Sequence, residues 1–185
     1  MLAAAAAQPD RLVVGVDANA VGMATASRRA AARPSRDGLS NALFVVAAAE
    51  ALPAELDGVA DLVTVHFPWG SLLRGLLGAD PATMTGLTRV LRPGGTLQLL
   101  VSSTARDHSA GVAPIQAATL RALAESYATW GLAVTELRPA TVADVTAAHS
   151  TWGKRLGAGT HRPTWLLRAQ LAPAGCRREP VRSSS

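Results

Sequence analysis

The feature that most constrains the fold of this 185-residue chain is the alternation of short apolar runs with longer segments of helical pattern. The first run, residues 12–16 (LVVGV), is continuously apolar, as expected for a strand that is covered on both faces. This alternation predicts an α/β fold with a mostly parallel central sheet and helices on both faces. Strands are predicted at 12–16, 42–46, 61–66, 96–102, 132–137 and 165–171, and helices at 2–8, 19–33, 70–78, 81–91 and 114–130.

The composition allows a packed core and limits the class of protein. Hydrophobic residues make up 49% of the chain and charged residues 17%, which excludes global disorder. No apolar run approaches the roughly 20 residues of a membrane-spanning helix, and the apolar stretch at 2–7 is too short for a secretory signal. The single cysteine, Cys176, excludes an internal disulfide framework and a zinc site of paired cysteines. We expect a cytoplasmic protein that does not contact a membrane.

Charge is distributed unevenly along the chain. Residues 1–137 hold 10 basic and 11 acidic residues, net −1, whereas residues 138–185 hold 8 basic and 2 acidic residues, net +6. This asymmetry predicts a polyanionic partner for the last quarter of the chain. The alternative is a solvated tail, because several of these arginines stand in a Pro/Ser-rich end. We predict a folded domain over 1–172 and a basic disordered tail over 173–185.

Two acidic residues follow the first two predicted strands. Ligands of parallel sheets bind beyond the carboxyl ends of the strands, so such residues are the first candidates for a site. Asp17 follows the first strand, where a carboxylate can accept hydrogen bonds from the ribose hydroxyls of a nucleoside cofactor or cap the next helix. Glu50 follows the second strand, where it either borders an adenine ring or is a solvated surface residue.

The segment FPWGSLLRG (67–75) follows the third predicted strand. Pro68 cannot donate a hydrogen bond to a strand ladder, so it turns the chain. Trp69 then presents a wide aromatic face at the mouth of the cleft, where a stacking partner would bury it. The alternative is that Trp69 caps the core.

Several motifs, in a consistent order, resemble a known family. The turn LRPGGT (91–96) is similar to the one before the fifth strand of class I S-adenosylmethionine (SAM)-dependent methyltransferases. Asp17, AEALP (49–53), PWGSLLRG (68–75) and STWGKRL (150–156) resemble the aminoglycoside-resistance methyltransferases that modify N1 of adenine 1408 in 16S rRNA. The resemblance runs from near residue 10 to near residue 171. It implies a Rossmann-like fold with a C-terminal antiparallel strand, SAM as cofactor, and 16S rRNA in the 30S subunit as substrate.

The resemblance also implies roles for individual residues. Trp69 and Trp152 would sandwich a flipped adenine, and a backbone carbonyl near Phe67 or Pro68 would hold its amino group. A base inside an RNA helix must be flipped out to reach a buried methyl donor, and stacking offsets part of that cost. Adenine N1 has an in-plane lone pair, so the transfer needs no base and depends mostly on positioning. The implied cofactor-binding residues are Asp17, Ala49, Glu50 and Ser71.

Basic residues next to Trp152 are candidates for rRNA contacts. Lys154, Arg155 and Arg162 lie on a glycine-rich loop, where they would bind phosphates without reading sequence. Arg28 and Arg29 belong to a second basic cluster. The alternatives are an ordinary basic loop and a solvated helix face. The four histidines have no metal-ligand spacing, so we predict no metal site, and a monomer is the expected state.

The family's opening strand and its glycine-rich turn, Asp-x-Gly-x-Gly-x-Gly, are not found in the sequence. We therefore expect an N-terminally incomplete domain in which the strands at 12–16 and 61–66 expose unpaired edges, with weak cofactor binding and low stability. Two explanations of the missing strand and turn stay open. The chain is an N-terminally shortened version of an ordinary enzyme, produced by a misplaced start codon, or it is a decayed or divergent relative that cannot hold the cofactor. Two other functions stay open: a small-molecule methyltransferase on the same fold, and a non-catalytic rRNA-binding remnant.

Overall fold

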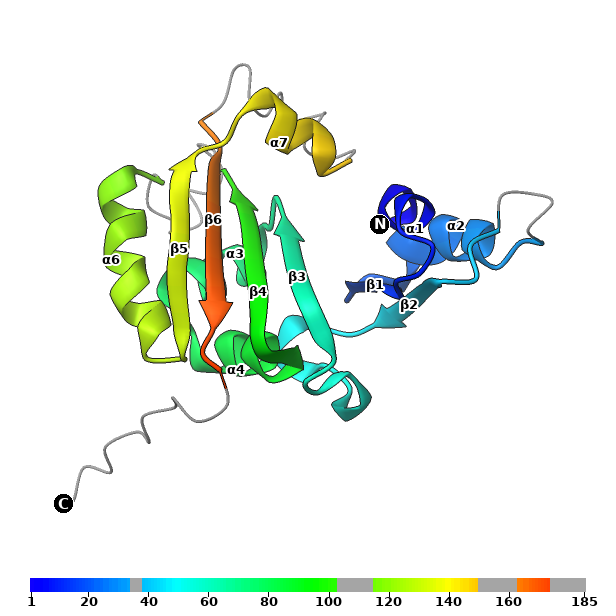
Figure 1. Cartoon of the computed structure of the whole chain (residues 1–185), viewed down its shortest axis with the longest axis horizontal. Helices are drawn as coiled ribbons and strands as arrows, with labels where there is room; N and C mark the ends of the chain where they lie inside the picture. The colour runs from blue at the N-terminus through cyan, green and yellow to red at the C-terminus, as the bar shows by residue number, and fades with distance from the viewer. Residues whose placement is uncertain (34–37, 103–114, 150–162, 174–185) are drawn as a thin grey trace. The chain divides into compact units, whose positions relative to one another are not determined.

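The computed structural model describes residues 1–33, 38–102, 115–149 and 163–173 (Figure 1). The contacts within the chain define two compact units, Met1–Leu52 and Pro53–Ser185. The described strands form one sheet in each unit. The α/β class predicted from the sequence is confirmed, but the strands form two sheets and not one.

The first unit is a parallel pair of strands with two helices. It contains α1 (Leu2–Ala7), β1 (Val13–Asp17), α2 (Ala20–Ala30), β2 (Ala42–Val46) and the 3₁₀ turn η2 (Ala49–Ala51). Asn19 caps α2 by accepting hydrogen bonds from the backbone N–H groups of Val21 and Gly22, at 3.1 and 3.2 Å. Asn41 Nδ2 lies 2.9 Å from the carbonyl oxygens of Ala5, Gln8 and Arg11, so it ties α1 and the following turn to the start of β2.

The run at 12–16 is not covered on both faces as its apolar sequence predicts. Leu12 is 67% exposed and Val16 41% exposed. Among the described strands β1 pairs with β2 alone, and all five of its residues are intermediate or exposed in burial. Within the part of the chain that the structure describes, β1 and β3 each lie at an edge of their own sheet. The N-terminally incomplete domain stays a prediction.

The second unit is a four-stranded mixed sheet with helices. Its strand order is β3-β4-β6-β5; β3 and β4 are parallel, and β6 is antiparallel to both of its neighbours. The predicted C-terminal antiparallel strand is therefore confirmed. The elements are η3 (Ala54–Leu56), β3 (Ala60–His66), α3 (Gly70–Gly78), α4 (Pro81–Val90), β4 (Leu91–Val101), α6 (Ala117–Ala128), β5 (Leu132–Pro139), α7 (Val142–Ala147) and β6 (Trp165–Leu171).

The two faces of this sheet differ in character. Leu97, Leu99, Leu167 and Ala169 are at most 1% exposed and share one face, because Leu99 pairs with Leu167 and Leu97 with Ala169. Helices α3 and α4 lie behind the sheet in Figure 1 and cover this face. Leu100 and Leu166, one residue along, face the opposite side, where α7 covers them at the carboxyl end of β4.

Next to the part covered by α7, the face of the sheet that carries Leu100 is polar. Arg168 Nε donates to Gln98 Oε1 at 2.9 Å, and Arg168 Nη1 donates to Glu136 Oε2 at 2.9 Å. These three residues stand side by side on β4, β6 and β5, because Gln98 and Glu136 both pair with Arg168. The sheet therefore uses one face for its core and leaves polar groups on the other.

Several predicted boundaries shift in the structure. The helix predicted at 81–91 ends at Val90, and β4 begins at Leu91, earlier than the predicted strand at 96–102. The turn Arg92–Gly95 is accommodated by a register shift, because Ala60 pairs with Leu91 but Leu62 pairs with Thr96. The predicted helices at 19–33 and 114–130 are shorter, Ala20–Ala30 and Ala117–Ala128. The domain limits 1–172 and 173–185 stay predictions.

Tyr127 joins two helices of the apolar layer. Its ring on α6 is fully buried, and its hydroxyl donates to the carbonyl oxygen of Leu76 on α3 at 3.1 Å. Burial raises the pKa of the Tyr127 hydroxyl far above its ordinary value. The phenol is therefore neutral and available as a donor throughout the working pH range.

Replacing Tyr127 with Phe removes this one hydrogen bond and leaves the ring in place. We expect the free energy of unfolding to fall by about 1 kcal/mol, because Leu76 loses a buried donor. Urea denaturation followed by circular dichroism measures this difference. The control is Ser126→Ala, an exposed position on the same helix. A Tyr127→Phe midpoint equal to that of the control would contradict the structure.

Candidate functional site

The turn after β3 is the most constrained part of the chain near the predicted site. Phe67 has a φ of 51°, in the left-handed region that non-glycine residues rarely adopt. Its side chain is 3% exposed and packs with Leu100, Ala148 and Leu166, and its N–H donates to the Leu100 carbonyl oxygen at 2.8 Å. These contacts stabilise the left-handed backbone of Phe67, which is unfavourable for a non-glycine residue on its own.

This turn determines the exposure of Trp69. Pro68 is buried and ends the strand. Trp69 then stands at the N-cap position of α3 with an extended backbone, φ −143° and ψ 170°, and its side chain is 73% exposed. Trp69 therefore does not cap the core, and its indole face is accessible to a ligand.

Four predicted site residues come together at this end of β3. Phe67, Pro68 and Trp69 form the turn, and Ser71 lies exposed in the first turn of α3. Phe67 and Pro68 are buried, whereas Trp69 and Ser71 are exposed. The turn thus presents an aromatic face next to a hydroxyl group.

The remaining predicted cofactor residues lie together in the first unit. Asp17 is the last residue of β1, and Ala49 and Glu50 begin the turn η2 after β2. The two strands are parallel, and Ala47 N–H donates to the Asp17 carbonyl oxygen at 3.1 Å, so Asp17 and η2 follow the same edge of the sheet. Asp17 and Glu50 are both exposed.

Asp17 does not cap α2. Its Oδ1 accepts a hydrogen bond from the N–H of Asn19 at 2.8 Å, and Asn19 is the capping residue. Asp17 therefore orders the turn into the helix and keeps its carboxylate at the surface. Such a carboxylate suits the recognition of vicinal ribose hydroxyls, which are hydrogen-bond donors.

Helix α7 is fixed at its amino end by an ion pair. Arg138 Nη1 and Nη2 donate to the two carboxylate oxygens of Asp144 at 2.6 and 3.1 Å, a two-point geometry. Asp144 Oδ2 also accepts from Thr141 N–H at 2.7 Å, and Asp144 N–H donates to the Thr141 hydroxyl, which completes a capping box. Hydrogen bonds from Arg138 and Thr141 hold the pKa of the Asp144 carboxyl well below its ordinary value.

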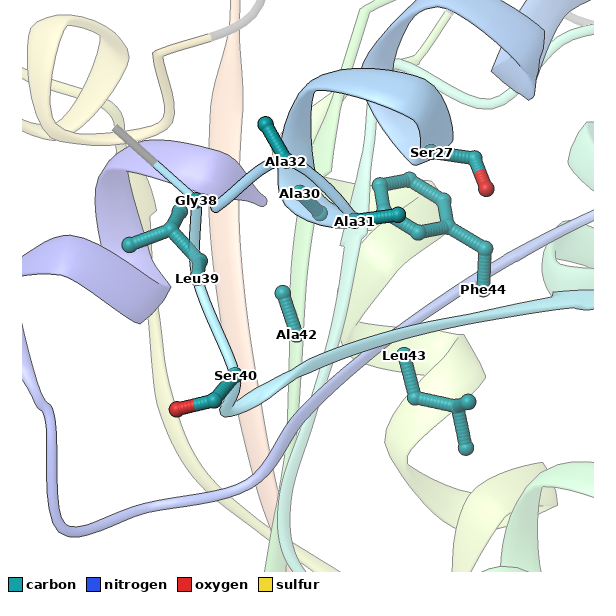
Figure 2. Close-up of a pocket in the computed structure, with 10 residues that line it drawn as sticks. All are labelled: Ser27, Ala30, Ala31, Ala32, Gly38, Leu39, Ser40, Ala42, Leu43 and Phe44. Carbon is teal, nitrogen blue, oxygen red and sulfur yellow. The ribbon is translucent and has the colours of Figure 1, made fainter. Parts of the chain in front are cut away.

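The first unit also contains a shallow recess that is separate from the predicted site residues (Figure 2). It has a volume of about 470 Å³ and lies between the carboxyl end of α2 and the start of β2. None of the predicted site residues lines it. Its lining consists of Ser27, Ala30, Ala31, Ala32, Gly38, Leu39, Ser40, Ala42, Leu43 and Phe44.

Some predicted residues are not brought into the site by the described structure. Arg28 and Arg29 are exposed in the last turn of α2. Trp152, Lys154, Arg155 and Arg162 lie outside the described residues. Within the described part of the chain, no group of three or more His, Cys, Asp or Glu is arranged to hold a metal ion, and no helix has the length and apolar character to cross a bilayer.

Sequence reasoning missed one residue next to the turn. His66 is the last residue of β3, its side chain is half-buried, and its Nε2 is buried without a hydrogen-bond partner among the described residues. The available signal was its position directly before Phe67 and Pro68.

Comparison with known proteins places these features in one family. The family model described as NpmA, 16S rRNA (adenine(1408)-N(1))-methyltransferase, matches residues 1–171. A 16S rRNA (adenine(1408)-N(1))-methyltransferase of Streptoalloteichus hindustanus is 36% identical over 159 residues, which cover 83% of this chain and 73% of the relative. A protein of the same name from Escherichia coli is 27% identical over 159 residues, covering 80% of this chain and 71% of the relative.

The solved structures that match this chain are methyltransferases of the same family. The structure of a tryptophan-to-alanine mutant of the 16S rRNA (adenine(1408)-N(1))-methyltransferase from Catenulisporales acidiphilia, with its cosubstrate SAM, matches with a TM-score of 0.83 and 32% identity. It covers 97% of this chain and 82% of the other. The 16S rRNA methyltransferase KamB matches with a TM-score of 0.79 and 30% identity, covering 93% and 82%. The fold, the turn after β3 and these matches together show that the chain belongs to the 16S rRNA (adenine(1408)-N(1))-methyltransferase family, a family of SAM-dependent enzymes.

Proposed function

We propose that this chain transfers a methyl group from SAM to N1 of adenine 1408 of 16S rRNA in the 30S subunit and so confers aminoglycoside resistance. The observation that carries this proposal is the exposed indole of Trp69, held at the carboxyl end of β3 by the buried Phe67. Family membership supplies the substrate and the position that is modified.

The residues at the carboxyl ends of β1 and β2 fit the cofactor. The Asp17 carboxylate at the end of β1 would accept hydrogen bonds from the ribose hydroxyls of SAM, and the η2 turn at Ala49 and Glu50 would border the adenine ring of the cofactor. The Ser71 hydroxyl offers a further polar contact from α3. SAM supplies an electrophilic methyl group on a sulfonium centre.

The proposed chemistry needs little from the protein beyond positioning. The N1 lone pair of adenine lies in the ring plane and would form the new N–CH₃ bond while the S–CH₃ bond of the sulfonium breaks and its electron pair stays on sulfur. The positive charge passes from sulfur to the methylated adenine, so no residue removes a proton first. The carbonyl oxygen of Phe67 or Pro68 accepts a hydrogen bond from the adenine amino group and so orients N1. Correct placement of the two reacting atoms lowers the barrier by converting their encounter into a step within one complex.

The adenine must leave its RNA helix to reach this site. Unstacking costs a few kcal/mol, and stacking on an aromatic side chain returns roughly 1–3 kcal/mol per base. Trp69 provides one stacking face, and we infer that Trp152 provides the second. A base held between two indoles keeps N1 in a fixed plane.

We further infer that the basic residues dock the protein on folded rRNA. Arg28 and Arg29 lie exposed on α2, and Lys154, Arg155 and Arg162 belong to the basic last quarter of the chain. Such contacts bind phosphates without reading sequence and weaken as salt rises. We propose a monomer that acts in the cytoplasm, where its ribosomal substrate is.

Primer extension on 16S rRNA tests this function. We expect a stop at adenine 1408 in cells that express the chain, together with aminoglycoside resistance. Methylation of a metabolite with no stop on 16S rRNA would favour the small-molecule alternative and overturn the proposal. Salt-dependent binding of 30S subunits without methyl transfer would favour a non-catalytic rRNA-binding protein and would also overturn it.

Replacing Trp69 or Trp152 with Ala removes one stacking face. A loss of roughly 1–3 kcal/mol of stacking corresponds to a decrease of roughly 5- to 150-fold in kcat/KM for 30S subunits. Trp69→Phe retains an aromatic face, and we expect an intermediate rate. The matched control is Val59→Ala, which shortens an exposed apolar side chain just before the opposite end of β3. Wild-type rates for both alanine variants would exclude the sandwich.

Replacing Asp17 with Asn keeps the shape of the side chain and removes its charge. The Asn oxygen can still accept from Asn19 N–H, so we expect the turn to persist. Hydrogen bonds to a charged group contribute about 1.5–3 kcal/mol, which predicts a roughly 10- to 150-fold weaker Kd for SAM in calorimetry. Asp10→Asn changes an exposed carboxylate just before β1 and serves as the control. Equal affinities for both variants would remove Asp17 from the cofactor site.

A further inference from the structure

A continuous network of hydrogen-bonded polar side chains crosses the polar face of the four-stranded sheet. Glu136 on β5 accepts from two arginines, with Oε2 bonded to Arg168 Nη1 at 2.9 Å and Oε1 bonded to Arg138 Nε at 2.6 Å. Arg168 also reaches Gln98 on β4, and Arg138 reaches Asp144 on α7. The polar network therefore connects β4 to α7, and it consists of Gln98, Arg168, Glu136, Arg138 and Asp144.

The polar network fixes geometry more than it adds to stability. The side chains of Arg138 and Arg168 are 36% and 43% exposed, and water screens ion pairs that are open to it, so each pair adds little to the free energy of folding. In contrast, both carboxylate oxygens of Glu136 and both of Asp144 are bonded to arginines. Contacts through two atoms restrict direction as well as distance, so the network can set the orientation of α7.

Helix α7 depends on such contacts because it is short. It has six residues, and a helix of that length is not stable by itself in water. Figure 1 shows α7 at the end of the sheet where β3 and β5 finish. There Val145 and Ala148 pack in the apolar cluster of Phe67. Apolar packing has no preferred direction, whereas the bonds from Arg138 to Asp144 do, so the two kinds of contact together define where α7 lies.

The position of α7 bears on both tryptophans of the proposed site. Ala148 at its carboxyl end packs with Phe67, which precedes Trp69 in the turn after β3. His149, with a φ of 47°, follows the C-cap and ends the helix, and Trp152 comes three residues later in the sequence. Helix α7 therefore supports the Trp69 turn by packing and sets the point from which the chain continues towards Trp152.

We propose that Arg138 is a positioning residue for methyl transfer, which orients α7 through Asp144 and so holds the Phe67–Trp69 turn in the geometry that receives adenine 1408. This inference rests on the proposed function, because that function gives the geometry its purpose. Arg138 acts through α7 and needs no contact with adenine or SAM. Glu136 and Arg168 hold the Arg138 guanidinium against the sheet, so that its other nitrogens face Asp144.

The expected effect of losing Arg138 is on turnover and not on cofactor affinity. A misplacement of about 1 Å in a reacting geometry can lower a rate by roughly 100-fold. The proposed cofactor residues Asp17, Ala49 and Glu50 lie on other elements, so the Kd for SAM should not change. A variant that only loosens the fold would lower the fraction of active protein and leave the kcat of the folded fraction unchanged.

The test compares Arg138→Met with Arg138→Lys. Met keeps an unbranched apolar side chain and removes every donor, and we expect it to lower kcat for 30S subunits by roughly 10- to 100-fold, with the Kd for SAM within about twofold of wild type. Lys retains the charge and can reach Asp144 at a single point, so we expect it to recover part of the loss.

The matched control is Arg89→Met on α4, the helix that lies with α3 over the opposite face of the sheet. The Arg89 side chain is also 36% exposed and also forms an ion pair, with Asp57 at 3.1 Å. Its loss should cost the fold about as much as the loss of Arg138. We expect Arg89→Met to keep the wild-type kcat.

A double-mutant cycle tests whether Arg138 acts through Asp144. Asp144→Asn retains an oxygen that can accept from Thr141, so the cap of α7 persists, but it offers Arg138 only one acceptor. If the two residues act as one unit, Arg138→Met combined with Asp144→Asn should be no slower than the slower single variant. Losses that multiply in the double variant would contradict this coupling.

Hydrogen exchange gives a second readout that does not depend on methyl transfer. Arg138→Met should speed exchange at the Phe67 amide, which is bonded to the Leu100 carbonyl oxygen, and at the Ala148 amide, which is bonded to the Asp144 carbonyl oxygen. Arg89→Met should not change exchange at these two amides. If wild type fails to methylate 16S rRNA, the proposed function is wrong, and the exchange result still decides whether Arg138 holds the turn.

Three outcomes would overturn the inference. The first is unchanged kcat and unchanged exchange in Arg138→Met. The second is a folded Arg138→Lys that is as impaired as Arg138→Met. The third is an equal loss of kcat in Arg89→Met, which would show that general stability is what matters. Should Arg138→Met fail to fold, Asp144→Asn decides, since a wild-type kcat with wild-type exchange at Phe67 in that variant would also overturn the inference.

Discussion

The candidate site depends on one backbone conformation, the left-handed Phe67 at the end of β3. Such a conformation costs about 1–3 kcal/mol for a non-glycine residue, and burying a Phe side chain contributes about as much in the opposite direction. The hydrogen bond from Phe67 N–H to the Leu100 carbonyl oxygen stabilises this conformation further. The chain can therefore reverse directly after the strand, bury Pro68, and leave Trp69 exposed at the start of α3.

The two faces of the four-stranded sheet serve different purposes: one carries the apolar core, and the other carries polar residues and the elements near the candidate site. Its apolar face, with Leu99 and Leu167, is covered by helices and contains most of the fully buried side chains of the described residues. The opposite face is polar at Gln98 and Arg168 and is covered only locally by α7, through Leu100 and Leu166. Helix α7 is fixed at its amino end through Asp144 and packs against this cluster through Ala148 and Val145, so it covers the face locally without adding a second core.

The sequence predicts those parts of the structure that local pattern controls. The strands follow apolar runs, and the turn after β3 follows from Pro68 and the exposed position of Trp69. The other features depend on contacts with residues that are distant in the sequence or on the detailed geometry of a turn. The early start of β4 at Leu91 depends on a register shift against Ala60. Helix capping, the alternative role of Asp17, belongs to Asn19, two residues later.

The central claim is that the exposed indole of Trp69 receives a flipped adenine. The most direct measurement is an electron cryo-microscopy structure of the chain bound to the 30S subunit in the presence of a non-reactive SAM analogue. We expect adenine 1408 outside its RNA helix, with its ring in van der Waals contact with the face of Trp69. Adenine 1408 still stacked within the RNA of a bound complex, or a Trp69 side chain turned away from the base, would contradict it.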